Sequence, residues 1–450
     1  MSATFLILLT AGSIALLLIL IMVVRVQAFL ALLLVSIIVA IVGGIPITEI
    51  TQAIQDGMGG TLGYIAIVVG IGTMLGEIVQ VSGGAQRIAD TIIRSFGENK
   101  SQWALAAVGL IVAIPVFFEV ALILFIPLIY DMTRKTGRSI LYYGIPLVGG
   151  IAVAHAFIPP TPGPVAVASL IGADLGWVIL MGIIAGVPSA AVGGVFFGKF
   201  IAKKIHRDVP DYMEVEVPES AADRERKLPS FGMVISIIAL PLVLILLNTG
   251  SDILLAEGDP VRRWLSLIGH PFTALLLATL LSFYLLGTRL GFTAAEIQKI
   301  ASRSMEPVGM IILVTGAGGA FGQILIATGV GEALVGLMED TNMPVILFAF
   351  LVATVVRVSQ GSATVAMVTA AGLIAPIVSM GDYSAPLLAC ITIAIACGGT
   401  VLSHVNDSGF WLVNQYMGLT EKETLQSWTV METIIGLTGL AVVMTIGAFL

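Results

Sequence analysis

Arg357, His404, Asn406 and Asp407 are polar side chains set within strongly apolar stretches of the sequence. A guanidinium, an imidazole, an amide and a carboxyl group in such surroundings can bind an anion, relay a proton or pair with one another. A charged side chain at the centre of a membrane costs roughly 2.5–3.5 kcal/mol even on the lenient insertion scale. These four residues therefore indicate a binding site at membrane depth, and the chain around them must be arranged to hold it.

Arg357 lies in a segment whose two apolar arms are each too short to cross a membrane. The arms are Pro344–Val356 and Val365–Val378, and a Gly/Ser/Thr-containing break separates them. A crossing takes about 20 helical residues, so the pattern predicts a re-entrant hairpin over 344–378. Unpaired backbone at its tip is tolerated only against protein or a wet cavity. The substrate-binding candidates at this tip are Arg357, Ser359, Gln360, Gly361, Ser362 and Thr364.

The residues at this tip have a functional and a structural interpretation. The planar fork of Arg357 suits a carboxylate, and the alternative is a structural ion pair with Asp407 or Glu119. The free N–H groups that open the second arm near Ser362 and Thr364 offer the positive end of a helix dipole to an anion. The alternative for these two hydroxyls is a simple helix cap, and both interpretations can hold together.

Breaks of the same kind occur elsewhere in the chain. A hairpin is predicted over 103–130, and membrane-length segments at 140–172 and 385–416 are both interrupted. Four prolines between Pro159 and Pro164 deny helix to several residues, which favours a break that lines a site over a mere kink. The substrate-binding candidates in the two interrupted segments are Thr161, His404 and Asn406.

Three further groups are candidates for proton coupling: Glu119, Asp407 and His155. Burial favours the neutral form of a carboxyl group, so an acid flanked by apolar residues can take up and release a proton near neutral pH. The alternative for the two acids is a neutral carboxyl bonded to a backbone carbonyl. A histidine within a membrane can relay protons, and an interhelical hydrogen bond is the alternative for His155 and for His404.

The composition defines the class of protein. Of 450 residues, 58% are hydrophobic and only 11% charged, against about 25% charged in a soluble domain. This excludes an ordinary soluble domain and predicts a polytopic membrane protein. Cys390 and Cys397 fall in one apolar run and are expected to be reduced and buried rather than a disulfide or metal pair. No metal, no cofactor and no enzymatic activity are predicted.

The two halves of the chain repeat. Gly70-Ile-Gly-Thr-Met-Leu-Gly76 matches a glycine pattern that starts 246 residues later, at Gly316, and Trp177 matches Trp428. Each half is predicted to make five crossings and one hairpin, so the second half must be inverted. Inverted repeats with broken helices are typical of secondary transporters. We therefore predict an all-α fold with a first repeat over 1–201, a cytoplasmic linker over 202–229 and a second repeat over 230–450.

The Lys and Arg residues test this topology independently. With the N-terminus outside, 18 of the 21 basic residues fall on the inner side. Arg262 and Arg263 fall outside, and Arg357 lies within the membrane. This is a strong positive-inside signal, and it places both termini on the outer face.

Four segments together resemble the gluconate permease family of proton symporters. They are Phe117–Val120, His155–Pro164, Gln360–Ala366 and Ser403–Trp411, in the same order along the chain. The resemblance covers essentially the whole chain and implies a carrier in the bacterial inner membrane with the two-hairpin, elevator-type fold of the ion-transporter superfamily. It also implies a homodimer. Thr161 stands where many members of the family have histidine.

The function expected from these observations is import of gluconate or a related sugar acid by proton symport. The partners would be a small anionic substrate, protons and the lipid bilayer, with no nucleic acid. Two alternatives remain open at this point: a carrier for another small hydroxylated carboxylate or an amino acid such as D-serine, and a passive anion channel. Counterflow separates carriers from channels, because a carrier accelerates exchange from the opposite side and a simple pore does not.

Overall fold

The computed structural model describes residues 2–97, 100–210, 228–306, 308–341 and 343–450. Throughout these ranges the chain forms helices and their connections, without a strand. Nine helical segments in the described part of the chain are long and apolar enough to cross a membrane. The predicted all-α polytopic membrane fold is confirmed. Residues 211–227 of the predicted linker lie outside the described residues.

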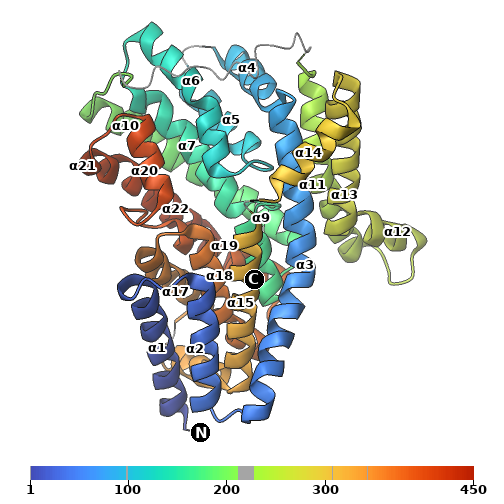
Figure 1. Ribbon diagram of the computed structural model, residues 1–450, viewed down its shortest axis with the longest axis vertical. Coiled ribbons are helices and arrows are strands. Elements are labelled where there is room, and N and C mark those ends of the chain that lie inside the picture. The colour runs from blue at the N-terminus through green and yellow to red at the C-terminus, as the bar shows by residue number, and fades with distance from the viewer. Residues whose placement is uncertain (1, 98–99, 211–227, 307, 342) are drawn as a thin grey trace.

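The first half begins with three apolar helices. They are α1 (Ala3–Leu18), α2 (Ala28–Val42) and α3 (Ile47–Val81). With 35 residues and a rise of about 1.5 Å per residue, α3 is much longer than a bilayer core is thick. Figure 1 shows α3 running along most of the length of the molecule, with α1 and α2 beside its lower part.

The first hairpin and the first broken helix follow, close to the predicted bounds of 103–130 and 140–172. The hairpin consists of α5 (Ser101–Val112) and α6 (Phe118–Thr136), and the broken helix of α7 (Ile140–Phe157) and α8 (Pro162–Ile171). The break is where the prolines predict it, since Pro162 can open a helix but cannot continue one. The half closes with α9 (Leu175–Ser189), a π-helical stretch and α10 (Phe197–Lys204).

The second half repeats this succession. Its membrane helices are α11 (Phe231–Leu254), α13 (Pro271–Ser282) and α15 (Val308–Ala327). The second hairpin is α17 (Val345–Gln360) with α18 (Ala363–Met380), and the second broken helix is α19 (Ala385–Thr400) with α20 (Ser408–Tyr416). The last span comprises α21 (Glu421–Thr424), a π-helical turn and α22 (Val430–Gly447). Both predicted breaks in this half are confirmed.

One predicted span starts in the wrong place. The apolar run from Trp264 to Gly287 predicts a single helix, but the chain folds into α12 (Pro260–Ile268) and, after a turn, α13. Pro271 excludes the helical conformation of the residue before it and so ends the shorter helix. α12 projects from the side of the molecule (Figure 1), and Trp264 is exposed on it.

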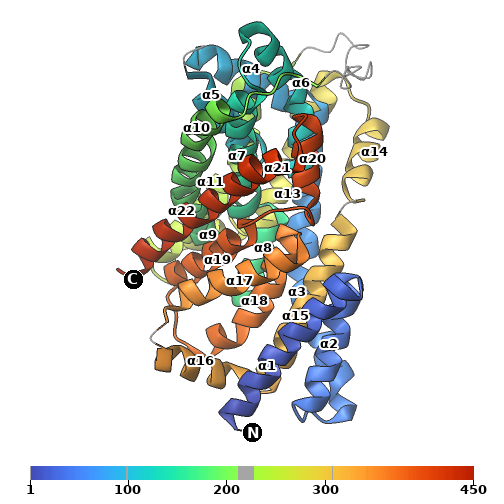
Figure 2. The ribbon, with the colours of Figure 1, turned by 90° about the vertical axis from the view of Figure 1, so that its left-hand side faces the viewer.

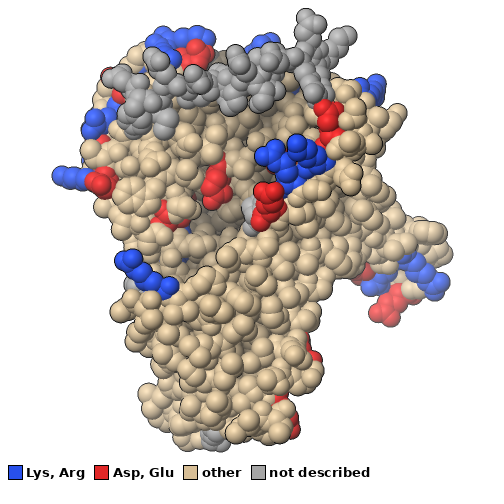
Figure 3. Space-filling model, in the orientation of Figure 1, with Lys and Arg blue, Asp and Glu red and all other residues tan. Residues whose placement is uncertain are grey.

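Three short helices were not expected from the sequence. They are α4 (Gly84–Phe96), α14 (Ala294–Ser304) and α16 (Val330–Thr341). α4 and α14 carry charged residues, and α4 lies at the end of the molecule where Lys and Arg gather in Figure 3. A broad surface below that end is almost free of charge, as a lipid-facing band requires.

The hairpins and the broken helices pack against one another at the centre of the fold. α17 and α18 contact α19, and α8 contacts both α18 and α19 (Figure 2). The tip of the first hairpin rests on α3 at Gly76, where a Cβ atom would lie 1.8 Å from the Pro115 carbonyl oxygen. Only glycine permits this approach. These contacts bring the hairpin and the broken helix of each half together at the centre of the fold.

Candidate functional site

A cavity of about 100 Å³ lies where the two hairpins and the two broken helices meet. The first half lines it from the start of α6 and the end of α7. The second half lines it from the tip of the second hairpin, the break before α20 and the start of α22. Its polar lining residues are Glu119, His155, Arg357, Ser362, Thr364, Thr400, Asp407, Ser408, Trp428 and Glu432.

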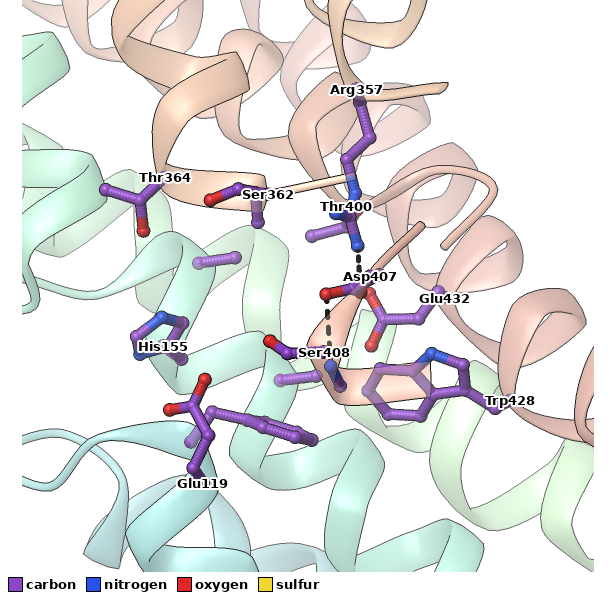
Figure 4. Close-up of a pocket in the computed structure, with 15 residues that line it drawn as sticks. Glu119, His155, Arg357, Ser362, Thr364, Thr400, Asp407, Ser408, Trp428 and Glu432 are labelled. Carbon is purple, nitrogen blue, oxygen red and sulfur yellow. Dashed lines mark hydrogen bonds and ion pairs between the residues drawn. The ribbon is translucent and has the colours of Figure 1, made fainter. Parts of the chain in front are cut away.

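A second lobe of about 200 Å³ adjoins this cavity. Glu119, His155, Ser362 and Thr364 line both lobes, while residues of α15 such as Thr315 line the second alone. Together the lobes reach the lower end, about 300 Å³, of the range typical of small-molecule sites. Figure 4 shows Glu119 and His155 on one side of the space, facing Asp407 and Glu432 on the other.

Arg357 forms an ion pair with Asp407 inside the protein. One Arg357 nitrogen, Nη2, lies 2.5 Å from Asp407 Oδ2, and the arginine is only 2% exposed. The structural ion pair given as the alternative role of Arg357 is therefore present, with Asp407 as the partner. The pair does not exhaust the arginine, because its Nε and Nη1 atoms are buried and find no hydrogen-bond partner in the described part of the chain. Among the described residues that line the cavity, Arg357 is the one cation.

The Asp407 carboxylate is held from three directions. Besides Arg357, Ser403 donates its hydroxyl to Oδ2 at 2.5 Å, and the backbone N–H of Gly409 donates to Oδ1 at 3.1 Å. Trp428 in turn donates its indole N–H to the Ser403 hydroxyl at 2.6 Å. Asp407 thus caps α20 and joins the second break to the last span.

Glu119 and His155 face the cavity from the first half. Glu119 lies in the first turn of α6 and its side chain is exposed rather than buried, which differs from the expectation of an acid enclosed by apolar residues. His155 lies in the last turn of α7 with its ring 6.4 Å from that of Phe117. His155 Nδ1 is buried and has no hydrogen-bond partner among the residues that the structure describes.

The tip of the second hairpin is attached to the second break by side chains predicted to bind substrate. His404 Nε2 lies 2.8 Å from the Val358 carbonyl oxygen, and Asn406 donates its amide N–H to the same oxygen at 3.0 Å. Gly361 ends α17 with φ of 85°, and a Cβ atom there would lie 2.1 Å from the Asn406 carbonyl oxygen. These three residues satisfy the end of α17 and do not line the cavity.

Three other predicted ligands also lie outside the lining. The Thr161 hydroxyl donates to the Ile158 carbonyl at 2.7 Å, and the Ser359 hydroxyl donates to the Val355 carbonyl at 2.7 Å. Gln360 has both amide atoms buried without a partner in the described ranges, but it does not border the cavity.

Ser362 and Thr364 are the predicted hairpin residues that do line the cavity with Arg357. Ser362 is the N-cap of α18, and its hydroxyl oxygen accepts from the Val365 N–H at 3.4 Å. The cap interpretation is therefore realised, and the positive end of α18 is directed at the same space. An anion in the cavity would meet a helix N-terminus and a guanidinium together.

Four lining residues were missed by the sequence analysis: Thr400, Ser408, Trp428 and Glu432. Glu432 carries the strongest signal that was overlooked, because it is the one acid within the last apolar run of the sequence, nine residues after the nearest charged residue, Glu423. An ionisable residue inside a span is a functional candidate by default. It is 3% exposed, and its Oε1 atom has no hydrogen-bond partner in the ranges described.

The arrangement defines a class of protein. A small polar cavity enclosed by hairpin tips and helix breaks, in a chain with many membrane-length helices, is the architecture of a polytopic membrane transporter. The cysteines agree with a structural role, since Cys390 and Cys397 are free and buried as predicted.

Comparison with known proteins gives the family. The model of the GntP family permeases matches residues 4–449, and the chain belongs to this family. It is 42% identical to the low-affinity gluconate transporter of Escherichia coli K12 over 439 residues, covering 98% of this chain and 97% of the relative. It is 39% identical to the gluconate permease of Pseudomonas aeruginosa, covering 95% and 94%. The Gnt-II system L-idonate transporter of Escherichia coli K12 is 38% identical, covering 98% of each.

Two solved structures share the fold at low sequence identity. MtrF of Neisseria gonorrhoeae, described as one of a class of antimetabolite efflux pumps, superimposes with a TM-score of 0.65 at 12% identity and covers 92% of this chain and 93% of its own. The YdaH transporter of Alcanivorax borkumensis gives 0.63 at 11% identity, covering 94% and 98%. These two structures support the fold. Membership of the GntP family and the similarity to its transporters make the chain a permease and not an enzyme, as predicted.

Proposed function

We propose that this permease imports gluconate or a closely related sugar acid across the bacterial inner membrane by proton symport, with both termini on the periplasmic side. The observation that carries the proposal is the buried Arg357, two of whose nitrogens find no partner in the described residues, in a cavity that also presents hydroxyl and carboxyl groups. The names of the curated relatives support the substrate class, and one of them supports L-idonate as a second candidate.

The substrate carboxylate would bind between Arg357 and the N-terminus of α18. Charge-assisted hydrogen bonds from a guanidinium are the strong ones, and the dipole of α18 adds to them. The polyol chain needs several short polar partners, and Ser362, Thr364 and Ser408 are placed to supply them. A site that hydrogen-bonds hydroxyl groups discriminates sharply against analogues that lack them.

The coupling proton would enter by groups that face the cavity. Glu119 and His155 border both lobes, and His155 Nδ1 has no hydrogen-bond partner among the described residues, so it is available for a relay. Asp407, the third candidate from the sequence, is engaged by Arg357, Ser403 and a backbone N–H. We assign it to holding the arginine. The homodimer implied by the resemblance remains a prediction.

Uptake into proteoliposomes tests the proposal. The purified protein should concentrate gluconate when the outside is more acidic, and L-idonate should compete for the same uptake. Hexanoate lacks the hydroxyls and glucose lacks the carboxylate, so both should compete poorly. A preloaded liposome should show counterflow, which a passive channel does not. Uptake that ignores the pH gradient would remove proton symport from the proposal, and uptake of no sugar acid would remove the substrate class.

A further inference from the structure

Glu432 is a buried acid that the site described so far does not use. It lies in the first turn of α22, directly after the π-helical turn Leu425–Thr429, and is 3% exposed. Its carboxyl group lines the same cavity as the Arg357–Asp407 pair (Figure 4). Its Oε1 atom has no hydrogen-bond partner among the described residues.

The fold does not need a carboxyl group at this position. When the halves are aligned on Trp177 and Trp428, which are 251 residues apart, the counterpart of Glu432 is Met181. Met181 is buried at 5% exposure in the equivalent last span of the first half. An apolar side chain therefore serves the packing there, while the second half places an acid beside Arg357, the one cation among the described lining residues.

The charges around Glu432 do not balance when all acids are ionised. Arg357 is the cation that interacts with Glu432, but it already forms an ion pair with Asp407 at 2.5 Å. Across the cavity lie Glu119, a further acid, and His155. A buried carboxylate that shares its counterion with a second carboxylate is strongly disfavoured, as in sites where two acids hold one proton.

We infer that Glu432 is the binding site of the coupling proton, an assignment that rests on the proposed proton symport of a sugar acid. With Glu432 ionised, Arg357 faces two carboxylates, those of Asp407 and Glu432. The three groups then carry a net negative charge, and the cavity repels an anion. With Glu432 protonated, Arg357 and Asp407 form a neutral pair, and the free nitrogens of the arginine attract the substrate carboxylate. Proton binding and anion binding then favour each other, as linkage requires. At the alkaline inner face Glu432 loses its proton, and the site releases the anion.

The test compares Glu432→Gln with Glu421→Gln, a matched change at an exposed acid in the same segment. For one proton per substrate, a gradient of two pH units without a membrane potential gives about 100-fold accumulation. The wild type and E421Q should reach that ratio. E432Q should exchange gluconate in counterflow, but its inside concentration of gluconate should not exceed the outside concentration. An E432Q protein that concentrates gluconate like the wild type overturns the assignment.

Gluconate binding to the purified protein gives a readout independent of turnover. The affinity of the wild type should fall by up to about tenfold per unit as the pH rises, since the proton it requires is lost. E432Q should bind with the same affinity across that range, and E432D, which keeps a carboxyl group, should restore the pH dependence. A folded E432Q that binds no gluconate at any pH, or that keeps the wild-type pH dependence, also overturns it. If the wild type itself fails to accumulate any sugar acid, the proposed function fails instead.

Discussion

Replacing Arg357 with glutamine should weaken substrate binding and destabilise the fold, and the two effects can be separated. A hydrogen bond to a charged group contributes about 1.5–3 kcal/mol, so the apparent affinity for gluconate should fall by about 10- to 150-fold. A neutral hydroxyl contact contributes about 0.5–1.5 kcal/mol. Thr364→Ala should therefore cost about 2- to 12-fold, less than R357Q.

The effect on stability follows from the burial of the pair. Arg357 is 2% exposed and the Asp407 side chain 12% exposed, and removing one partner of a buried ion pair costs about 3–5 kcal/mol. R357Q leaves Asp407 without its cation, and Asp407→Asn leaves Arg357 without its anion. The double variant R357Q/D407N leaves neither charge alone, so it should be more stable than either single variant. It should not regain affinity, because it still lacks the guanidinium.

Thermal unfolding of the detergent-purified variants reports the loss of stability, and competition for gluconate uptake reports the loss of affinity. Ser359→Ala is the matched control, since its hydroxyl bonds within α17 outside the cavity lining. Unchanged affinity in R357Q, or affinity that returns with stability in the double variant, would show that the arginine is purely structural. The substrate model built on it would then be wrong.

Three shorter predictions concern the topology, the hairpin tip and the proton path. A cysteine at exposed Glu257 should react with an impermeant thiol reagent on whole cells and one at exposed Lys135 should not; the reverse labelling contradicts the assigned orientation. Gly361→Ala should abolish transport because its Cβ atom would collide with the Asn406 carbonyl in the adjacent break. Gly172 has the same left-handed backbone but open space around it, so Gly172→Ala should cost only about 1–2 kcal/mol of stability. Glu119→Gln should slow gradient-driven uptake without lowering its final ratio, and a lowered ratio would make Glu119 the coupling residue instead.

The hairpins and breaks could be predicted because they depend on chain length and local chemistry. Arms shorter than a membrane crossing, and prolines between Pro159 and Pro164, leave the backbone few alternatives. The span predicted from Trp264 began too early, because the apolar run continues through a turn that only Pro271 marks. Short amphipathic helices such as α4 escaped notice, since their character depends on what the fold leaves for them to cover.

The side chains of the site were harder to assign than the segments that carry them. Arg357, Ser362, Thr364, Asp407, Glu119 and His155 all reach the cavity, as their positions in the breaks predict. His404 and Asn406 stand in the same break but bond to the end of α17, because nothing in a sequence says which carbonyl a polar group will find. Glu432 was overlooked because it lies in an unbroken span, where hydrophobic length dominates the interpretation.

The second hairpin shows why breaks in helices serve both packing and binding. The turn at Gly361 leaves the carbonyl end of α17 and the N–H end of α18 side by side, with opposite partial charges. His404 and Asn406 satisfy the carbonyl end with donors from the neighbouring break. The N–H end remains directed at the cavity, next to a guanidinium. The fold thus covers the carbonyl end of α17, which would repel an anion, and leaves the N–H end of α18, which attracts one, facing the cavity. The acids around Arg357 then make the attraction of an anion depend on a proton.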